Sequence, residues 1–227
     1  MYDWIIQNKD LMKIFYGLII SLICLVIVLK SDRLFRLSMH KGIRYFRNAF
    51  FFYGLAFVTR YFLSTPFFLD YLSLIYHFRI KFLFEFFLVI AGFFLLYSLL
   101  WKKIESQKIA YSSSLFNSYI LIFYLMAFII AFIDYLWDSY YLLFYSQFIL
   151  FIILFILSIS KLYQKPSAGF LKIYSIAMLC GLAAWLLNAL AGIYFQWNYT
   201  ALMIIYSLNI IVFLLFLFGV IKITNSR

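Results

Sequence analysis

Seven long apolar runs dominate this sequence and decide what kind of structure it can form. They cover residues 14–30, 48–65, 80–101, 115–134, 140–160, 172–195 and 200–221. Each run is close to the ~20 residues that an α-helix needs to cross ~30 Å of hydrocarbon. The runs are apolar on all faces, whereas the strands of a membrane barrel alternate apolar and polar residues. The sequence therefore predicts an all-α bundle of seven transmembrane helices.

The composition excludes a water-soluble fold. Hydrophobic residues make up 67% of the chain and charged residues 12%, whereas a typical soluble domain has about 25% charged residues. The net charge of +11 lies almost wholly in connectors, where we expect it to contact anionic lipid headgroups and not nucleic acid. No connector is long enough to fold by itself, so we predict one transmembrane domain over residues 1–227 and no soluble domain.

The positive charges alternate between successive connectors. Connectors one–two, three–four and five–six and the C-terminal tail carry fourteen of the nineteen cations and only two acids. Because cation-rich short connectors stay in the cytoplasm, we predict a multi-pass protein of the cell membrane with its N-terminus outside and its C-terminus in the cytoplasm. This orientation places Trp4, Trp137 and Trp197 at the outer interface and Trp101 at the inner one, as in an aromatic belt.

The connector between the first two runs holds a regular series of basic residues. Their spacings of three, four, four and three place them on one face if the segment is a single helix. Such a face would bind anionic lipid headgroups or a protein partner. The alternative is that the cations only set the topology and that Gly42 breaks the helix. The residues of this predicted cytoplasmic face are Arg33, Arg36, His40, Arg44 and Arg47.

Polar side chains inside the runs are candidates for a ligand pocket, because such groups are costly in a bilayer. Glu85 shares a helix face with Gly92 and would pair with Arg60; the alternative is that Arg60 reaches the outer headgroups alone. Asn188 belongs to a series of small residues that predicts close helix packing, with Ala177, Gly181, Ala184 and Ala191. The predicted pocket, which opens outward, consists of Arg60, Glu85, Gln147, Trp185, Asn188 and Asn209. The alternative is a set of interhelical hydrogen bonds.

No pattern typical of an enzyme or a metal site is found in the sequence. HExxH, GxSxG and paired membrane aspartates are absent. Cys24 and Cys180 lie in different runs and have no ligand spacing. Asp134 and Asp138 lie four residues apart, but two carboxylates are a poor site for calcium. We therefore expect no catalysis, no cofactor and no metal.

One tripeptide hints at an internal repeat. Gly54–Ala56 in the second run recurs as Gly181–Ala183 in the sixth. This offset would relate runs one to three to runs five to seven in the same orientation, with the fourth run between them. In helices rich in alanine and leucine, however, chance explains a match of three residues better than a repeat does.

Three functions are compatible with these features. The helix number and orientation resemble the seven-helix receptor and opsin plan, although the last run has no deep lysine for retinal. We expect a receptor-like sensor that binds a small ligand or lipid in the outward pocket and signals to a separate protein partner. The alternatives are a non-catalytic subunit or scaffold of a larger complex, and a small-solute transporter or channel. Pro66 and Pro166 lie at or outside run ends, which predicts unbroken helices and so disfavours a transporter.

Overall fold

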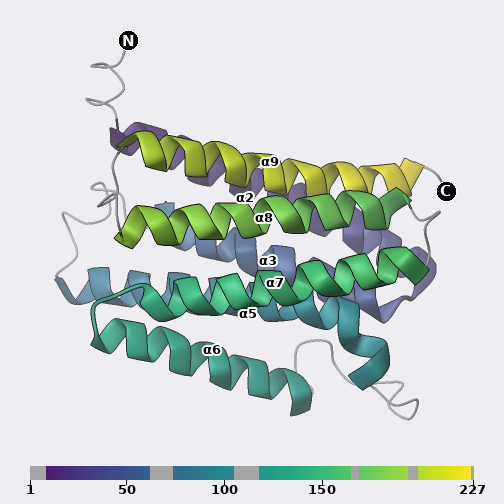
Figure 1. The fold of residues 1–227 in the computed structure, drawn as a ribbon, viewed down its shortest axis with the longest axis horizontal. Helices are drawn as coiled ribbons and strands as arrows, with labels where there is room; N and C mark the ends of the chain where they lie inside the picture. Colours follow the sequence, from purple (N-terminus) through teal and green to yellow (C-terminus); the bar gives the residue numbers. More distant parts are fainter. Residues whose placement is uncertain (1–8, 62–73, 105–117, 165–168, 194–198, 226–227) are drawn as a thin grey trace.

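The computed structural model describes residues 9–61, 74–104, 118–164, 169–193 and 199–225. All secondary structure in these ranges is α-helical, which confirms the predicted all-α class for the described part (Figure 1). Each helix overlaps one predicted apolar run. Trp4, Trp197, Pro66 and Pro166 lie outside the described residues. The helices are α2 (Lys9–Ser38), α3 (Lys41–Tyr61), α5 (Leu74–Ile104), α6 (Ser118–Leu136), α7 (Tyr141–Gln164), α8 (Gly169–Ile193) and α9 (Tyr199–Asn225).

Six of these helices are long and apolar enough to cross a membrane: α2, α5, α6, α7, α8 and α9. The chain is therefore a multi-pass integral membrane protein. The remaining described helix, α3, is 21 residues long and carries four cations near its ends. Its apolar middle is buried among the other helices, with Ala49, Phe50 and Ala56 fully enclosed.

Six helices form a closed ring, and one packs outside it. The ring order is α2, α3, α5, α7, α8 and α9, and α9 returns to pack against α2. The outer helix is α6, which packs against α5 and α7 along one edge of the bundle (Figure 1). Apolar side chains such as Leu121, Leu125 and Ile129 remain exposed on α6, as is typical of a helix that faces lipid.

The ring consists of two halves with the same arrangement. In one half α3 packs between α2 and α5, and in the other α8 packs between α7 and α9. The third helix of each half packs against the first helix of the other, α5 on α7 and α9 on α2. Although chance better explains the tripeptide match in the sequence, the packing thus relates runs one to three to runs five to seven. The fourth run forms the outer helix α6.

The burial pattern of α2 and α7 shows the same relation at the level of single residues. The offset from Gly54 to Gly181 is 127 residues. When 127 is added to the number of each buried residue of α2 between positions 16 and 31, the results are the numbers of all the buried residues of α7. The two sets are Tyr16, Gly17, Ile20, Ile23, Cys24, Ile27 and Ser31 on α2, and Leu143, Phe144, Gln147, Leu150, Phe151, Leu154 and Ser158 on α7.

The two glycines make equivalent contacts in the two halves. A Cβ built on Gly54 of α3 would lie 3.3 Å from the Cβ of Cys24 on α2. A Cβ built on Gly181 of α8 would lie 2.4 Å from Cε1 of Phe151 on α7. Cys24 and Phe151 are themselves separated by the same 127 residues. The described structure therefore supports an internal repeat that the sequence alone did not predict.

An aromatic plug fills the ring between α3, α8 and α9. Phe50 of α3 lies edge-on to two rings of α9, Phe213 at 5.9 Å and Phe216 at 5.0 Å between centroids. Phe216 also contacts Tyr174 of α8 at 5.7 Å and Phe46 of α3 at 6.1 Å. These five residues are all buried. They pack α3 against helices that are not its neighbours in the ring.

Candidate functional site

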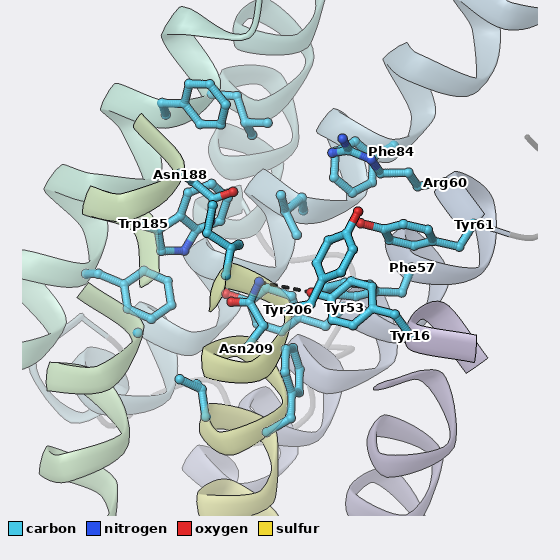
Figure 2. Close-up of a pocket in the computed structure, with 18 of the residues that line it drawn as sticks. Tyr16, Tyr53, Phe57, Arg60, Tyr61, Phe84, Trp185, Asn188, Tyr206 and Asn209 are labelled. Atoms are coloured by element: carbon cyan, nitrogen blue, oxygen red, sulfur yellow. Dashed lines mark hydrogen bonds between the residues drawn. The ribbon is translucent and has the colours of Figure 1, made fainter. Parts of the chain in front are cut away.

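A cavity of about 90 Å³ lies inside the ring, and its wall includes Phe213 and Phe216 of the aromatic plug. Figure 2 shows a close-up of this cavity. All six ring helices contribute to its lining, and α6 does not. The cavity therefore lies at the interface between the two halves of the repeat. Twelve of its 21 lining residues are aromatic, so its wall is largely apolar with polar groups at a few positions, as is usual for small-molecule sites.

Four of the six predicted pocket residues line this cavity together. They are Arg60 of α3, Trp185 and Asn188 of α8, and Asn209 of α9 (Figure 2). Glu85 and Gln147 do not line it. The series of small residues on α8 is buried as predicted, with Ala177, Ala184 and Ala191 almost fully enclosed, and this close packing positions Trp185 and Asn188.

Arg60 supplies the charge at one end of the cavity. Its guanidinium carbon lies 4.5 Å from the centroid of the Phe84 ring and 5.7 Å from the centroids of Tyr61 and Tyr140. Such cation–π contacts are worth about 0.5–2 kcal/mol each, with the larger values at desolvated sites. Within the described part of the chain, no other lining residue is charged. Arg60 is therefore the one charged side chain among the described residues of the cavity wall.

Tyrosine hydroxyls and amides form the polar groups deeper in the cavity. Asn209 donates a hydrogen bond from Nδ2 to the hydroxyl of Tyr16 at 2.9 Å (Figure 2). The ring of Tyr16 stacks on Tyr206, with 4.1 Å between centroids. Asn188 donates from Nδ2 to the carbonyl oxygen of Ala184 on its own helix, also at 2.9 Å. Sequence reasoning missed the tyrosines, because an isolated tyrosine in an apolar run is not distinguishable from a core aromatic.

Tyr53 has an unsatisfied polar group in the same wall. Its side chain is 4% exposed, and its hydroxyl makes no hydrogen bond to any described residue. It lines the cavity from α3, seven residues before Arg60. Because seven residues are about two helical turns, Tyr53 and Arg60 lie on the same face of α3, about 10 Å apart along its axis.

The predicted ion pair between Arg60 and Glu85 is not formed. Glu85 is fully buried, and neither of its carboxylate oxygens accepts a hydrogen bond from a described residue. The reason is that successive side chains of an α-helix point about 100° apart around its axis, so Glu85 and its neighbour Phe84 face different directions. Phe84 faces the cavity and receives Arg60 on its ring. Glu85 consequently points elsewhere in the bundle.

Gln147 lies at the contact between α5 and α7. A Cβ built on Gly92 would lie 3.0 Å from the Oε1 atom of Gln147, so the glycine allows the two helices to approach closely. Both polar atoms of the Gln147 amide are buried without a hydrogen-bond partner among the described residues. Gln147 is therefore a packing residue of the interface between the halves and not part of the cavity wall.

Asp134 and Asp138 have separate structural roles where α6 leads into α7. The Asp134 carboxylate accepts hydrogen bonds from the backbone N–H groups of Leu142 at 3.1 Å and Leu143 at 2.7 Å, and from Ser139 Oγ at 3.0 Å. It thus satisfies the free donors at the start of α7. Asp138 forms an ion pair with Lys81 at 2.9 Å, and this hydrogen bond lowers the pKa of Asp138. The described residues contain no group of three or more His, Cys, Asp or Glu that could hold a metal.

The predicted basic face is split between two helices. Helix α2 ends at Ser38 and α3 begins at Lys41, because Met39 adopts a left-handed conformation with φ of 50° and the chain reverses there. The interpretation of the five residues as one helix face was therefore wrong. Arg33 and Arg36 belong to α2, His40 lies in the connection, and Arg44 and Arg47 belong to α3.

The basic residues still gather at one end of the bundle, which we call the basic end. Asp32 of α2 joins the two helices there, since it pairs with Arg36 at 3.0 Å and with Arg47 of α3. Arg44 lies 5.5 Å from the centroid of the Phe35 ring. His40 packs edge-on to Trp101 with 5.1 Å between centroids. Whether this end binds lipid or a partner stays a prediction.

The arrangement as a whole can enclose a small molecule between two repeated halves, with an arginine at one end and tyrosine and asparagine groups further in. Comparisons of the chain with protein-family models, with curated proteins and with solved structures found no match. The features of the cavity that bear on function are its position at the repeat interface, its aromatic wall and Arg60.

Proposed function

We propose that this membrane protein is a receptor-like sensor that binds a small molecule in the central cavity. The observation that supports the proposal is the position of the cavity, enclosed by all six ring helices at the interface of the two halves. A ligand there contacts both halves and can change their relative packing. Isolated polar groups on an aromatic wall are typical of a binding site. The proposal includes no catalytic step.

A change in helix packing caused by ligand binding in the cavity can be transmitted to the basic end through the aromatic plug. Phe213 and Phe216 of α9 line the cavity and also pack against Phe50 of α3. Helix α3 begins at the basic end, where Arg47 pairs with Asp32 of α2. In the proposed orientation this end faces the cytoplasm, where a protein partner or anionic lipid would read the change.

Transport is a second candidate, because the internal repeat favours it. Repeats of the same orientation, related by an axis along the membrane normal, occur in transporters whose substrate site lies at the repeat interface. The cavity has that position here. In this function the aromatic plug would close the path toward the basic end, and rocking of the halves would open it.

One matched pair of substitutions tests binding in the cavity. Ile205 of α9 is 2% exposed and lines the cavity, whereas Ile211 of the same helix is 48% exposed and does not. The melting temperature would be measured in nanodiscs with and without the small-molecule fraction of the source cells. We expect the fraction to stabilise the wild type and Ile211→Trp but not Ile205→Trp. Equal shifts in all three, or none in the wild type, would refute the proposal.

Flux measurements separate the two candidate functions. Proteoliposomes loaded with the same fraction would release the bound compound only if the protein is a transporter. A sensor binds the compound without flux above that of empty liposomes. A subunit or scaffold, the remaining alternative, shows neither ligand-dependent stabilisation nor flux.

A further inference from the structure

We infer that a groove between α2 and α3 binds one acyl chain of an anionic phospholipid, whose headgroup contacts Arg36 and Arg44 at the basic end. This site is separate from the central cavity, because the two share no lining residue. The inference therefore goes beyond the proposed function and can fail independently of it. Three observations support it: the dimensions of the groove, its continuity with the basic end, and the contrast with the other half of the repeat.

The groove has the dimensions of one lipid chain in one leaflet. It has a volume of about 310 Å³ and lies between residues 18–28 of α2 and 50–58 of α3. An engineered apolar cavity of about 150 Å³, roughly half this volume, holds benzene. The α2 residues extend over about 15 Å along the helix axis, which is about half of the ~30 Å thickness of the hydrocarbon core. Leu22 and Leu25 of the lining are exposed, so a chain can enter from the lipid.

The lining offers a lipid chain an almost wholly apolar surface. Most of its side chains are leucine, valine or phenylalanine. The hydroxyl of Ser21 donates a hydrogen bond to the carbonyl oxygen of Gly17 at 2.7 Å, so its donor is satisfied within α2. Gly54 leaves the floor of the groove low, with the Cβ of Cys24 as the nearest atom to an added Cβ. The occupant of the groove is therefore a hydrocarbon chain.

The groove continues into the basic end because α2 and α3 keep one antiparallel register. Three contacts establish this register: Gly17 with Tyr61, Cys24 with Gly54, and Asp32 with Arg47. Asp32 follows the groove residue Val28 by four residues, and Arg47 precedes the groove residue Phe51 by four. Residues four apart share a helix face. The ion pair of Asp32 with Arg47 thus lies one helical turn beyond the end of the groove.

The charges at this end of the groove favour an anion. Asp32 pairs with both Arg36 and Arg47, so these three side chains together carry one net positive charge. Arg44, three residues before Arg47 on α3, adds a second. The Arg36 side chain is 79% exposed and donates one N–H to Asp32. A guanidinium has five N–H donors, so Arg36 keeps donors for a phosphate, which arginine binds through parallel hydrogen bonds.

The other half of the repeat differs at both parts of the site. The offset of 127 residues relates small or aliphatic groove residues of α2 to phenylalanines of α7, and arginines of the basic end to tyrosines. The pairs are Ser21 with Phe148, Cys24 with Phe151, Val28 with Phe155, Arg36 with Tyr163, and Arg47 with Tyr174. Phe151 packs against Gly181 at the place where the α2–α3 contact is open. Groove and positive charge therefore occur together in one half and are replaced together in the other, as expected of two parts of one site.

Three probes test the inference on the full chain in mild detergent. They are phosphatidylglycerol, phosphatidylcholine with the same acyl chains, and glycerol 3-phosphate, which has the phosphate and no chain. Affinities would be measured by native mass spectrometry and by melting-temperature shifts. Because a basic residue near a headgroup contributes about fivefold, we expect phosphatidylglycerol to bind at least about tenfold more tightly than phosphatidylcholine. Glycerol 3-phosphate should produce no shift, since it cannot occupy the groove.

One pair of substitutions tests the headgroup end. Arg36→Gln should reduce the preference for phosphatidylglycerol over phosphatidylcholine by about fivefold. The control is Lys172→Gln, which removes an exposed cation of α8 at the same end of the bundle and should leave the preference unchanged. The preference is a ratio measured within each variant, so a change in stability does not affect it.

A second pair tests the groove. Leu22→Trp adds a large side chain to the groove lining and should weaken the binding of both lipids. Its control is Ile149→Trp at the equivalent position of α7, where the native side chain is 55% exposed against 52% for Leu22. Ile149→Trp should leave both affinities unchanged.

Several outcomes would overturn the inference. They are equal binding of the two lipids to the wild type, equal losses of preference in Arg36→Gln and Lys172→Gln, and equal affinities in Leu22→Trp and Ile149→Trp. Binding of glycerol 3-phosphate as tight as that of phosphatidylglycerol would show a phosphate site that does not use the groove. A protein that Arg36→Gln releases from the purified chain, without any lipid preference in the wild type, would assign the arginines to a protein partner instead.

Discussion

Gly181 of α8 lies against the ring of Phe151 of α7 so closely that a Cβ on the glycine would be 2.4 Å from Cε1 and 2.8 Å from Cδ1. Both residues also line the central cavity. The equivalent contact in the other half, Gly54 with Cys24, leaves more space, with 3.3 Å to the nearest atom. The same position of the repeat therefore tolerates different amounts of added volume in the two halves.

Gly181→Ala should destabilise the protein more than Gly54→Ala does. The added methyl group overlaps a buried ring, and such overpacking costs about 1–3 kcal/mol. For a chain of this size each 1 kcal/mol lowers the melting temperature by about 2–4 °C. Melting curves of both variants in nanodiscs check the order. Equal melting temperatures for the two variants would contradict the geometry of the α7–α8 contact.

Removal of the Asp134 carboxylate should weaken the start of α7. Asp134→Ala leaves the N–H groups of Leu142 and Leu143 without their acceptor, and loss of such a cap costs about 0.5–2 kcal/mol. Asp134→Asn keeps one carbonyl oxygen and should have an intermediate effect. Melting curves of the two variants measure the difference. An unchanged melting temperature for Asp134→Ala would show that the cap contributes nothing.

Glu85→Gln should raise the melting temperature, in contrast to the decrease expected of a residue that pairs with Arg60. The substitution removes a buried carboxyl group that accepts no hydrogen bond from the described residues, and an amide of the same shape does not ionise, so folding no longer carries the free-energy cost of neutralising an acid. Gln147→Glu is the matched opposite change at another fully buried site and should lower the melting temperature. A lower melting temperature for Glu85→Gln would reveal a stabilising partner of the carboxylate.

The ion pair between Asp138 and Lys81 predicts a small pH dependence of stability. The hydrogen bond from Lys81 lowers the pKa of Asp138 below its ordinary value of 3.8. A lowered pKa in the folded state stabilises the fold at pH values above 3.8, and this contribution is lost as the pH falls through the folded value. Asp138→Asn should therefore lower the melting temperature slightly at pH 6 and by less at pH 3.

Asparagine is the suitable replacement in that experiment. Asp138 has a φ of 45°, and asparagine adopts this left-handed conformation more readily than most residues. The substitution consequently removes the charge without adding backbone strain. The Asp138 side chain is 77% exposed, so the effect should also decrease at high salt. A difference that is equal at both pH values would rule out the ion pair as its cause.

The helices themselves could be predicted from the sequence, because a uniformly apolar run of this length forms a transmembrane α-helix. The order of the helices in the ring could not be predicted, because every face of these helices is apolar and no periodic pattern shows which helices pack against each other. A helix break in the first connector was considered only at Gly42, and its actual position at Met39 could not be predicted because no glycine or proline stands there. The basic residues consequently looked like one continuous stripe.

The candidate site was predicted in part for a related reason. A charged or amide side chain in an apolar run is conspicuous, and Arg60, Trp185, Asn188 and Asn209 do line the cavity. The direction in which each side chain points around its helix cannot be read from the sequence, so the predicted pairing of Glu85 with Arg60 was wrong. The repeat is also hidden in the sequence, since α2 and α7 share a pattern of burial while their aligned buried residues include identical types only at Ser31 and Ser158.

The central claim is that the cavity between the two halves holds a small molecule, and native mass spectrometry after gentle extraction from the source membrane tests it most directly. Wild type, Ile205→Trp and Ile211→Trp would be compared under the same conditions. We predict one additional small mass on the wild type and on Ile211→Trp that is absent from Ile205→Trp. The same mass on all three proteins, or no small mass on the wild type, would contradict the claim.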